Sequence, residues 1–198
     1  MKFALSSYSL SSLVGKGEAT EKELIKIAKD LGFDGIEFAE INPPENKDKK
    51  EYAKELKAEC EKQGITPIQY SVGADFIYGS NGDLPKEIER LKGEVDIAVL
   101  LGVKGMRHDA TGGYNDEDKK FKGFQQALPR LIEGYKAVTE YAKEKGITLA
   151  IETGPEDADT LLMFIEDTKG GVGVNLDPAN FVMVTDQDPV DAVKKLGK

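Results

Sequence analysis

The chain has 198 residues, a formal net charge of −9 and a pI near 4.8. This acidity disfavours a nucleic-acid partner, because binding a phosphate backbone needs a basic face. Hydrophobic residues make up 39% and charged residues 32%, which is a globular composition and long enough for one domain over residues 1–198. With one cysteine, Cys60, and no run near the ~20 apolar residues of a membrane helix, we expect a cytoplasmic protein without a membrane partner.

Short apolar runs alternate with longer stretches of helical period along the chain, a pattern typical of βαβ units and a parallel sheet. The expected strands cover residues 3–9, 35–38, 67–72, 105–108, 148–152 and 172–176. The expected helices cover residues 20–31, 48–63, 85–101, 121–145, 158–167 and a last one that starts near 189. The first of these helices opens with Thr20 and Glu23, the spacing of a capping box. The pattern predicts an α/β fold with six strand–helix units.

Polar side chains occur at the expected carboxyl ends of these strands, where parallel α/β folds place their sites. In chain order they are Glu37, Glu40, Asp75, Arg107, His108, Asp109, Glu152, Asp177 and Asn180. A buried charge is costly unless it has a partner or a metal. One such residue is often a structural anchor, whereas several on one rim indicate a site.

Glu152 directly follows an apolar strand, so it is a candidate metal ligand and general base, or alternatively a partner of a neighbouring helix N-terminus. Asp177 is a candidate second carboxylate ligand, or alternatively a cap before an Asp-Pro turn. His108, the only histidine, contacts a substrate or is structural. Glu37 orients the site or holds a barrel layer, and Asp75 is a weaker candidate than these.

The whole chain resembles the xylose-isomerase-like TIM barrel superfamily, in its sugar phosphate isomerase/epimerase branch. The residues that carry the resemblance are Ser6–Leu10, Gly35–Glu37, Tyr70–Phe76, Gly105–Asp109, Ile151–Glu152, Leu176–Phe181 and Asp188–Lys195. The resemblance implies a parallel (β/α) barrel of the TIM type. A complete barrel of eight units usually has about 250 residues, so we expect six of the eight units in residues 1–198, as a C-terminally incomplete barrel domain.

The resemblance also implies a divalent cation (Mn, Mg, Co or Zn) held by Glu on strand 5, Asp on strand 6, His on strand 7 and Glu on strand 8. Glu152 and Asp177 match the first two ligands, and Glu152 would also be catalytic. Glu37, Arg107, His108 and Asn180 are the expected substrate-binding residues. The implied reaction is isomerisation or epimerisation of a sugar or sugar phosphate, in which a carboxylate shifts a proton next to a carbonyl group.

The incomplete barrel leaves alternatives open. With half of the implied ligands, three alternatives stay open: an active isomerase or epimerase, an isomerase or epimerase that is inactive as a fragment and lacks the metal, or a non-catalytic carbohydrate-binding or inert barrel fragment. The endonuclease branch of the superfamily is less favoured, because one histidine and a net charge of −9 do not suit a multi-metal, DNA-binding site. Strands 1 and 6 would be open sheet edges, so we expect a homo-oligomer joined through them.

Overall fold

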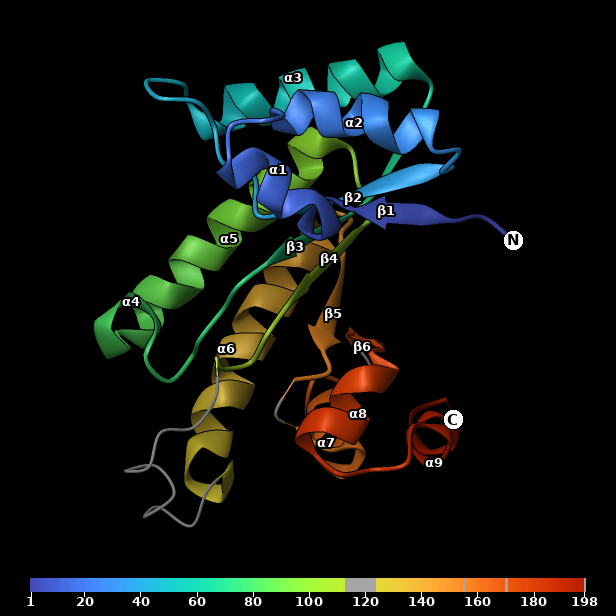
Figure 1. Ribbon diagram of the computed structural model, residues 1–198. Coiled ribbons are helices and arrows are strands. Elements are labelled where there is room, and N and C mark those ends of the chain that lie inside the picture. The colour runs from blue at the N-terminus through green and yellow to red at the C-terminus, as the bar shows by residue number, and fades with distance from the viewer. Residues whose placement is uncertain (113–123, 155, 170, 198) are drawn as a thin grey trace. The chain divides into compact units, whose positions relative to one another are not determined.

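The computed structural model describes residues 1–112, 124–154, 156–169 and 171–197. Within them, six strands form one parallel sheet in chain order (Figure 1). The strands are β1 (Ala4–Ser6), β2 (Gly35–Ala39), β3 (Thr66–Val72), β4 (Gly105–His108), β5 (Thr148–Glu152) and β6 (Val172–Asn175). The helices are the 3-10 turn η1 (Ser7–Leu10), α1 (Ser11–Gly15), α2 (Glu21–Asp30), α3 (Lys49–Gln63), α4 (Gly79–Gly82), α5 (Leu84–Leu101), α6 (Phe124–Glu144), α7 (Ala158–Asp167), α8 (Pro178–Val184) and α9 (Pro189–Leu196). The predicted α/β fold with six strand–helix units is confirmed; residues 121–123, where we expected the start of α6, lie outside the described residues.

The chain divides into two compact units. Unit 1 comprises residues 1–72 and 94–106, and unit 2 comprises residues 73–93 and 107–198. The expectation of one domain over residues 1–198 stays a prediction. Within the described ranges, none of the helices has both the length and the apolar character needed to cross a membrane.

In unit 1 the helix ends follow the sequence signals. The Glu23 backbone N–H donates to the Thr20 hydroxyl at 3.3 Å, and the Thr20 N–H donates to the Glu23 carboxylate at 2.7 Å, so the predicted capping box is formed. Asp48 caps α3, and Gly64 ends it with a left-handed φ of 64°. Helices α2 and α3 lie side by side, α2 next to β2 and α3 next to β3 (Figure 1).

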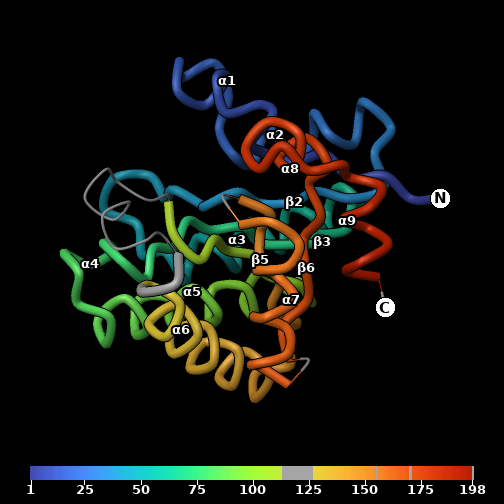
Figure 2. Tube along the Cα trace, turned by 90° about the horizontal axis from the view of Figure 1, so that it is seen from below, coloured from blue at the N-terminus to red at the C-terminus, as the bar shows by residue number. Residues whose placement is uncertain are grey.

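In unit 2 an aromatic cluster forms part of the core. The Tyr135 ring lies edge-on to Phe76, with ring centroids 5.4 Å apart, and contacts Phe164 at 5.3 Å. Strands β5 and β6 run side by side, and α7 packs against both β6 and α9 (Figure 2). This packing places the carboxyl ends of β5 and β6 next to each other.

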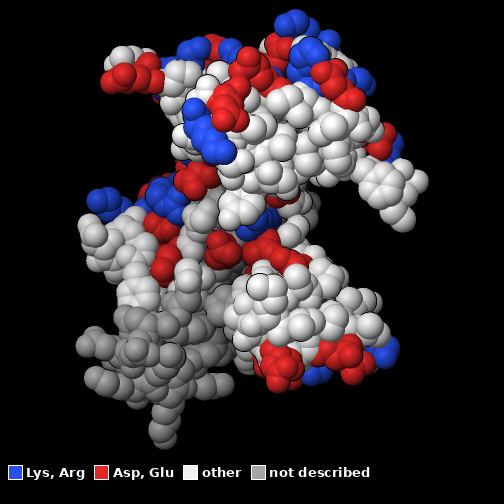
Figure 3. All heavy atoms as spheres, viewed as in Figure 1, with Lys and Arg blue, Asp and Glu red and all other residues white. Residues whose placement is uncertain are grey.

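Positive and negative side chains are mixed on the face of the molecule seen in Figure 3, including α2 and α3. The Glu55 carboxylate of α3 forms an ion pair with Lys47 at 2.8 Å and a second one with Lys22. On this face the lysines are interspersed with carboxylates, which is unlike the continuous basic surface of a nucleic-acid-binding protein.

Two sequence expectations about elements are wrong. The first strand ends at Ser6 and not at Ser9, because the Ser6 hydroxyl accepts the Tyr8 N–H at 3.4 Å and starts the 3-10 turn. The residues after Asp177 form helix α8, which was not among the helices expected from the sequence. Asp177 is its N-cap and Pro178 its first residue, which is a favoured helix start.

Candidate functional site

Glu152 ends strand β5 and is 8% exposed. The parallel register pairs it with Asn175, the last residue of β6. The Asn175 side-chain amide donates a hydrogen bond of 2.7 Å to Glu152 Oε2, and Arg107 Nε lies 3.1 Å from the same oxygen. Both of these contacts fall on Oε2 of Glu152.

The surroundings of Glu152 favour its protonated form. Burial is the largest influence and raises the pKa of Glu152 above its usual value. Arg107 and Asn175 lower the pKa, whereas the carboxylates of Asp109 and Asp177 raise it again. A carboxylate with a raised pKa is better matched to proton transfer near neutral pH.

Asp177 and Asn180 lie at the start of α8 and are tied to Thr153, the residue after β5. The Asp177 N–H donates to the Thr153 hydroxyl at 2.8 Å, and the Asn180 amide donates to the Thr153 carbonyl oxygen. The Asp177 carboxylate accepts the Ala179 N–H at 2.9 Å through Oδ1. Asp177 therefore forms a helix cap, the alternative weighed for it, and its role as a metal ligand stays a prediction.

His108 lies at the end of β4 and is fully buried. Its ring stacks on Tyr135, with centroids 4.7 Å apart, and its Nδ1 donates to the Asp109 carbonyl oxygen at 2.7 Å. Its Nε2 is buried and has no hydrogen-bond partner among the described residues. Burial lowers the pKa of His108 to about 4. A substrate contact by His108 stays a prediction.

Glu37 lies on β2 in unit 1. Its carboxylate accepts a hydrogen bond from the Ser71 hydroxyl of the neighbouring strand β3. The side chain is half-buried, and this contact fits the interpretation that Glu37 holds a layer of the sheet. A role of Glu37 in substrate binding stays a prediction.

Two polar residues of unit 2 were not selected from the sequence. Asn175 was passed over because an amide at a strand end carries no charge signal. Glu156 lies in a polar loop segment, yet it is 2% exposed and both of its carboxylate oxygens are buried with no hydrogen-bond partner among the described residues. Burial raises the pKa of Glu156 to about 7, and Asp109 and Asp157 also raise it.

A cavity of about 540 Å³ opens at the loops after β3 and β4 in unit 2. The charged residues that line it are Asp75, Glu87, Arg90 and Asp109. Arg90 pairs with Glu87 at 2.6 Å and donates to the Gly73 carbonyl at 2.8 Å. Among the residues that line this cavity, Asp75 and Asp109 were selected from the sequence, whereas Glu152 does not line it. The cavity lies at the carboxyl ends of the strands, where parallel α/β folds place their sites.

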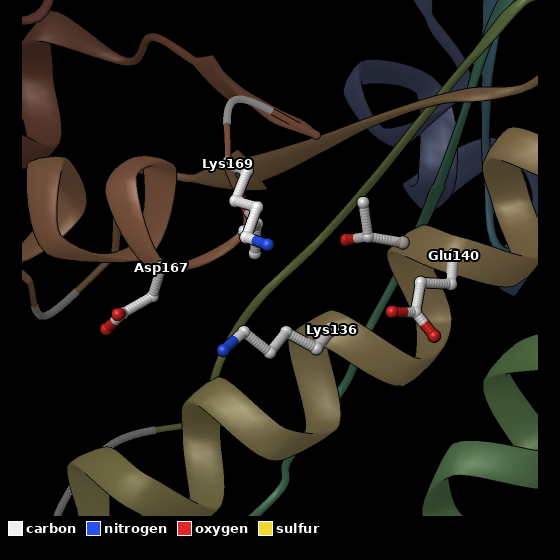
Figure 4. A pocket seen from close by; sticks show the side chains of 6 residues that line it. Lys136, Glu140, Asp167 and Lys169 are labelled. Carbon is white, nitrogen blue, oxygen red and sulfur yellow. The ribbon is translucent and has the colours of Figure 1, made fainter.

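A smaller cavity of about 260 Å³ lies between α6 and the turn before β6 (Figure 4). Lys136 and Lys169 extend into the space between these segments, and Asp167 points away from it. All three side chains are exposed. Because this turn leads into the amino end of β6, the cavity lies at the wrong end of the strand for the site of a parallel α/β fold.

The metal site implied by the resemblance stays a prediction. Carboxylate oxygens suit Mg²⁺ and Mn²⁺, and Glu152 and Asp177 provide them. Over the part of the chain that is described, no group of three or more His, Cys, Asp or Glu side chains is placed to hold a metal ion. Glu152 and Asp177 would therefore be two ligands of a set that needs others.

A six-stranded parallel sheet with sequential strand order and flanking helices defines an α/β protein of the TIM-barrel class. The chain belongs to the xylose isomerase-like TIM barrel family, whose model matches residues 25–198. No curated protein sequence matches the chain.

Solved structures of this class share the fold. A xylose isomerase domain protein from Planctomyces limnophilus aligns with a TM-score of 0.67 at 22% identity, over 87% of this chain and 63% of that one. A sugar phosphate isomerase/epimerase from Parabacteroides distasonis aligns with a TM-score of 0.69 at 19% identity, over 98% and 71%. A D-psicose 3-epimerase, solved with D-fructose, aligns with a TM-score of 0.71 at 18% identity, over 99% and 70%. The chain thus spans between 63% and 71% of these proteins' length.

Proposed function

We propose that the protein is an isomerase or epimerase of sugars or sugar phosphates. The observation that carries this proposal is the buried Glu152 carboxylate at the end of β5, held by Arg107 and Asn175 through one oxygen. The names of the similar structures, an epimerase and an isomerase/epimerase among them, support the same reaction class.

Glu152 is the proposed base. A proton on the carbon beside a substrate carbonyl would pass to the Glu152 carboxylate, and the electron pair of the broken C–H bond would be delocalised into the carbonyl group. Arg107, 3.1 Å from Oε2, stabilises the anionic form of Glu152 before the transfer. Return of the proton from Glu152 to the neighbouring carbon on the same face gives the isomer, whereas epimerisation would need a second acid on the opposite face of the substrate.

We propose a divalent cation as cofactor, with Glu152 and Asp177 among its ligands. When bound, such a cation would polarise a carbonyl or hydroxyl oxygen of the substrate. Arg107, His108, Asn180 and Glu37 are the proposed substrate-binding residues. We also propose that the protein is cytoplasmic and acts on a small sugar, and that it has neither a nucleic-acid nor a membrane partner.

Deuterium exchange tests the proposal. The chain would be incubated with MnCl₂ and D-fructose in D₂O, and proton NMR would follow loss of the signals on the carbons beside the carbonyl. We expect exchange by the unaltered chain and none by Glu152→Gln. Glu140→Gln, at an exposed position on α6, is the matched control and should leave exchange unchanged.

A second candidate function is sugar binding without turnover. The contacts of Glu152 with Arg107 and Asn175 favour it, because they would equally stabilise a purely structural carboxylate. Saturable binding of D-fructose without any exchange would support this alternative against the enzyme. Neither binding nor exchange would support an inert fragment.

A further inference from the structure

Unit 1 contains a separate cavity of about 310 Å³ that the proposed function does not use. It lies between residues 7–15, which follow β1, and the first turn of α2. Val14, Leu24 and Ala39 give it apolar walls, and no Lys or Arg side chain is among its lining residues. The cavity is thus largely apolar and has no positive charge of its own.

One carboxylate, that of Glu21, lines this cavity. Glu21 is 8% exposed, and its Oε1 accepts the Asn42 N–H at 2.9 Å. Its Oε2 is buried and makes no hydrogen bond of normal geometry among the described residues, although the Tyr52 side chain interacts with this carboxylate and lowers its pKa. A buried carboxylate oxygen without a partner carries a desolvation cost that a suitable ligand could relieve.

No described cation forms an ion pair with Glu21. The cation that acts on it electrostatically is Lys49, whose ammonium group is bound by Glu94 at 2.7 Å. Burial raises the pKa of Glu21, and the contributions of Asn42, Tyr52 and Lys49, which lower it, do not compensate. Among the described residues, the Glu21 carboxylate therefore has a hydrogen bond from Asn42 but no ion-pair partner.

We propose that this cavity binds a small primary alkylammonium ion, with its ammonium group against the Glu21 carboxylate and its alkyl chain against Val14 and Leu24. A cation would place a positive charge beside the Glu21 carboxylate, which forms no ion pair with the described residues. The hydroxyl of Ser11, at the cavity, can accept a second ammonium N–H. A neutral polyol would leave the charge unbalanced, and an anion would be repelled by it.

Propylammonium chloride is the probe, and propan-1-ol is its neutral analogue of similar shape. Both would be titrated into the ¹⁵N-labelled chain at pH 7.5, with shifts of backbone amides at residues 7–15 and 39–42 as the readout. We expect saturable shifts with propylammonium and at least about tenfold weaker binding of propan-1-ol, a difference of about 1.4 kcal/mol. Equal binding of the two probes, tighter binding of glycerol, or no saturable shift with propylammonium overturns the proposal.

Variants locate the site. Glu21→Gln keeps an oxygen that can accept the Asn42 N–H but removes the charge, and it should weaken propylammonium binding at least about tenfold. Glu18→Gln removes the same charge at an exposed position outside the cavity lining and should bind as the unaltered chain does. Ser11→Leu narrows the cavity but leaves Glu21 in place, and it should also weaken propylammonium binding. If Glu21→Gln fails to fold, Ser11→Leu still tests whether propylammonium binds in this cavity. Unchanged binding by a folded Glu21→Gln or by Ser11→Leu contradicts the proposal.

Discussion

Asn175 and Glu152 face each other across the last paired positions of β6 and β5, and the amide of Asn175 donates a hydrogen bond of 2.7 Å to Glu152 Oε2. The hydrogen bond stabilises the ionised carboxylate and so lowers its pKa. The position of one amide on the neighbouring strand thus helps to set the proton affinity of the proposed base.

Asn175→Ala is expected to raise the pKa of Glu152, because the ionised carboxylate loses a hydrogen bond that stabilises it while the carboxylate stays buried. The measurement is a pH titration of the Glu152 carboxyl carbon by NMR. Asn180→Ala is the matched control, since the Asn180 amide donates to the Thr153 carbonyl and not to Glu152. A Glu152 titration midpoint that is the same in Asn175→Ala and in the unaltered chain would show that this hydrogen bond has no such effect.

Glu156 should make the chain less stable as the pH rises. Its pKa is raised from 4.5 to about 7, so the folded state holds its proton more tightly than the unfolded state. The contribution of Glu156 to the free energy of unfolding is fully present below pH 4.5 and is lost as the pH rises through about 7. For a pKa shift of this size the free energy of unfolding falls by about 3 kcal/mol. Urea unfolding at pH 4.5 and pH 8 measures the loss.

Glu156→Gln removes this ionisation and should reduce the loss of stability between the two pH values. Glu166→Gln, at an exposed position on α7, should leave the loss as it is. If Glu156→Gln and the unaltered chain lose stability equally with pH, Glu156 does not hold its proton in the folded state.

His108 is expected to stay neutral well below pH 6. Its folded pKa of about 4 lies below the usual 6.5, so its contribution to stability is present above pH 6.5 and is lost as the pH falls through about 4. The chain contains one histidine, so the ring signals in a proton NMR titration need no assignment. A titration midpoint near 6.5 in the folded chain would contradict the buried, neutral ring, and the same chain in urea is the control.

Self-association is expected from the sheet edges. Strand β6 ends the sheet, and α8 next to it exposes Val182, Met183 and Val184 by 57%, 79% and 55%. Open strand edges and exposed apolar side chains both favour pairing between copies. Sedimentation velocity should show a dimer or larger species, and a concentration-independent monomer contradicts this expectation.

Met183→Asp should shift the sedimentation of this species toward the monomer, because it places a charge in the exposed apolar segment. Lys143→Asp, at an exposed position on α6, introduces the same side chain elsewhere and should not change the distribution. If both variants change the sedimentation distribution equally, the contact between copies of the chain does not depend on α8.

The repeating elements could be predicted from the sequence because each signal is local. The capping box of Thr20 and Glu23 requires a spacing of three residues and nothing distant. Helix α8 was missed although Asp177 and Pro178 carry a helix-start signal, because the same pair also favours a turn. The site residues were harder to predict. Glu152 can be recognised as a charged residue after an apolar strand, whereas the burial of Glu156 depends on packing that no short sequence pattern encodes.

The sequential order of the strands has a consequence for how the molecule is made. Every strand lies next to the strands that precede and follow it in the chain, so each pairing closes over one helical crossover. A nascent chain can therefore add one strand and one helix at a time as it leaves the ribosome, without waiting for a distant segment. The order of synthesis and the order of assembly can then coincide from β1 to β6.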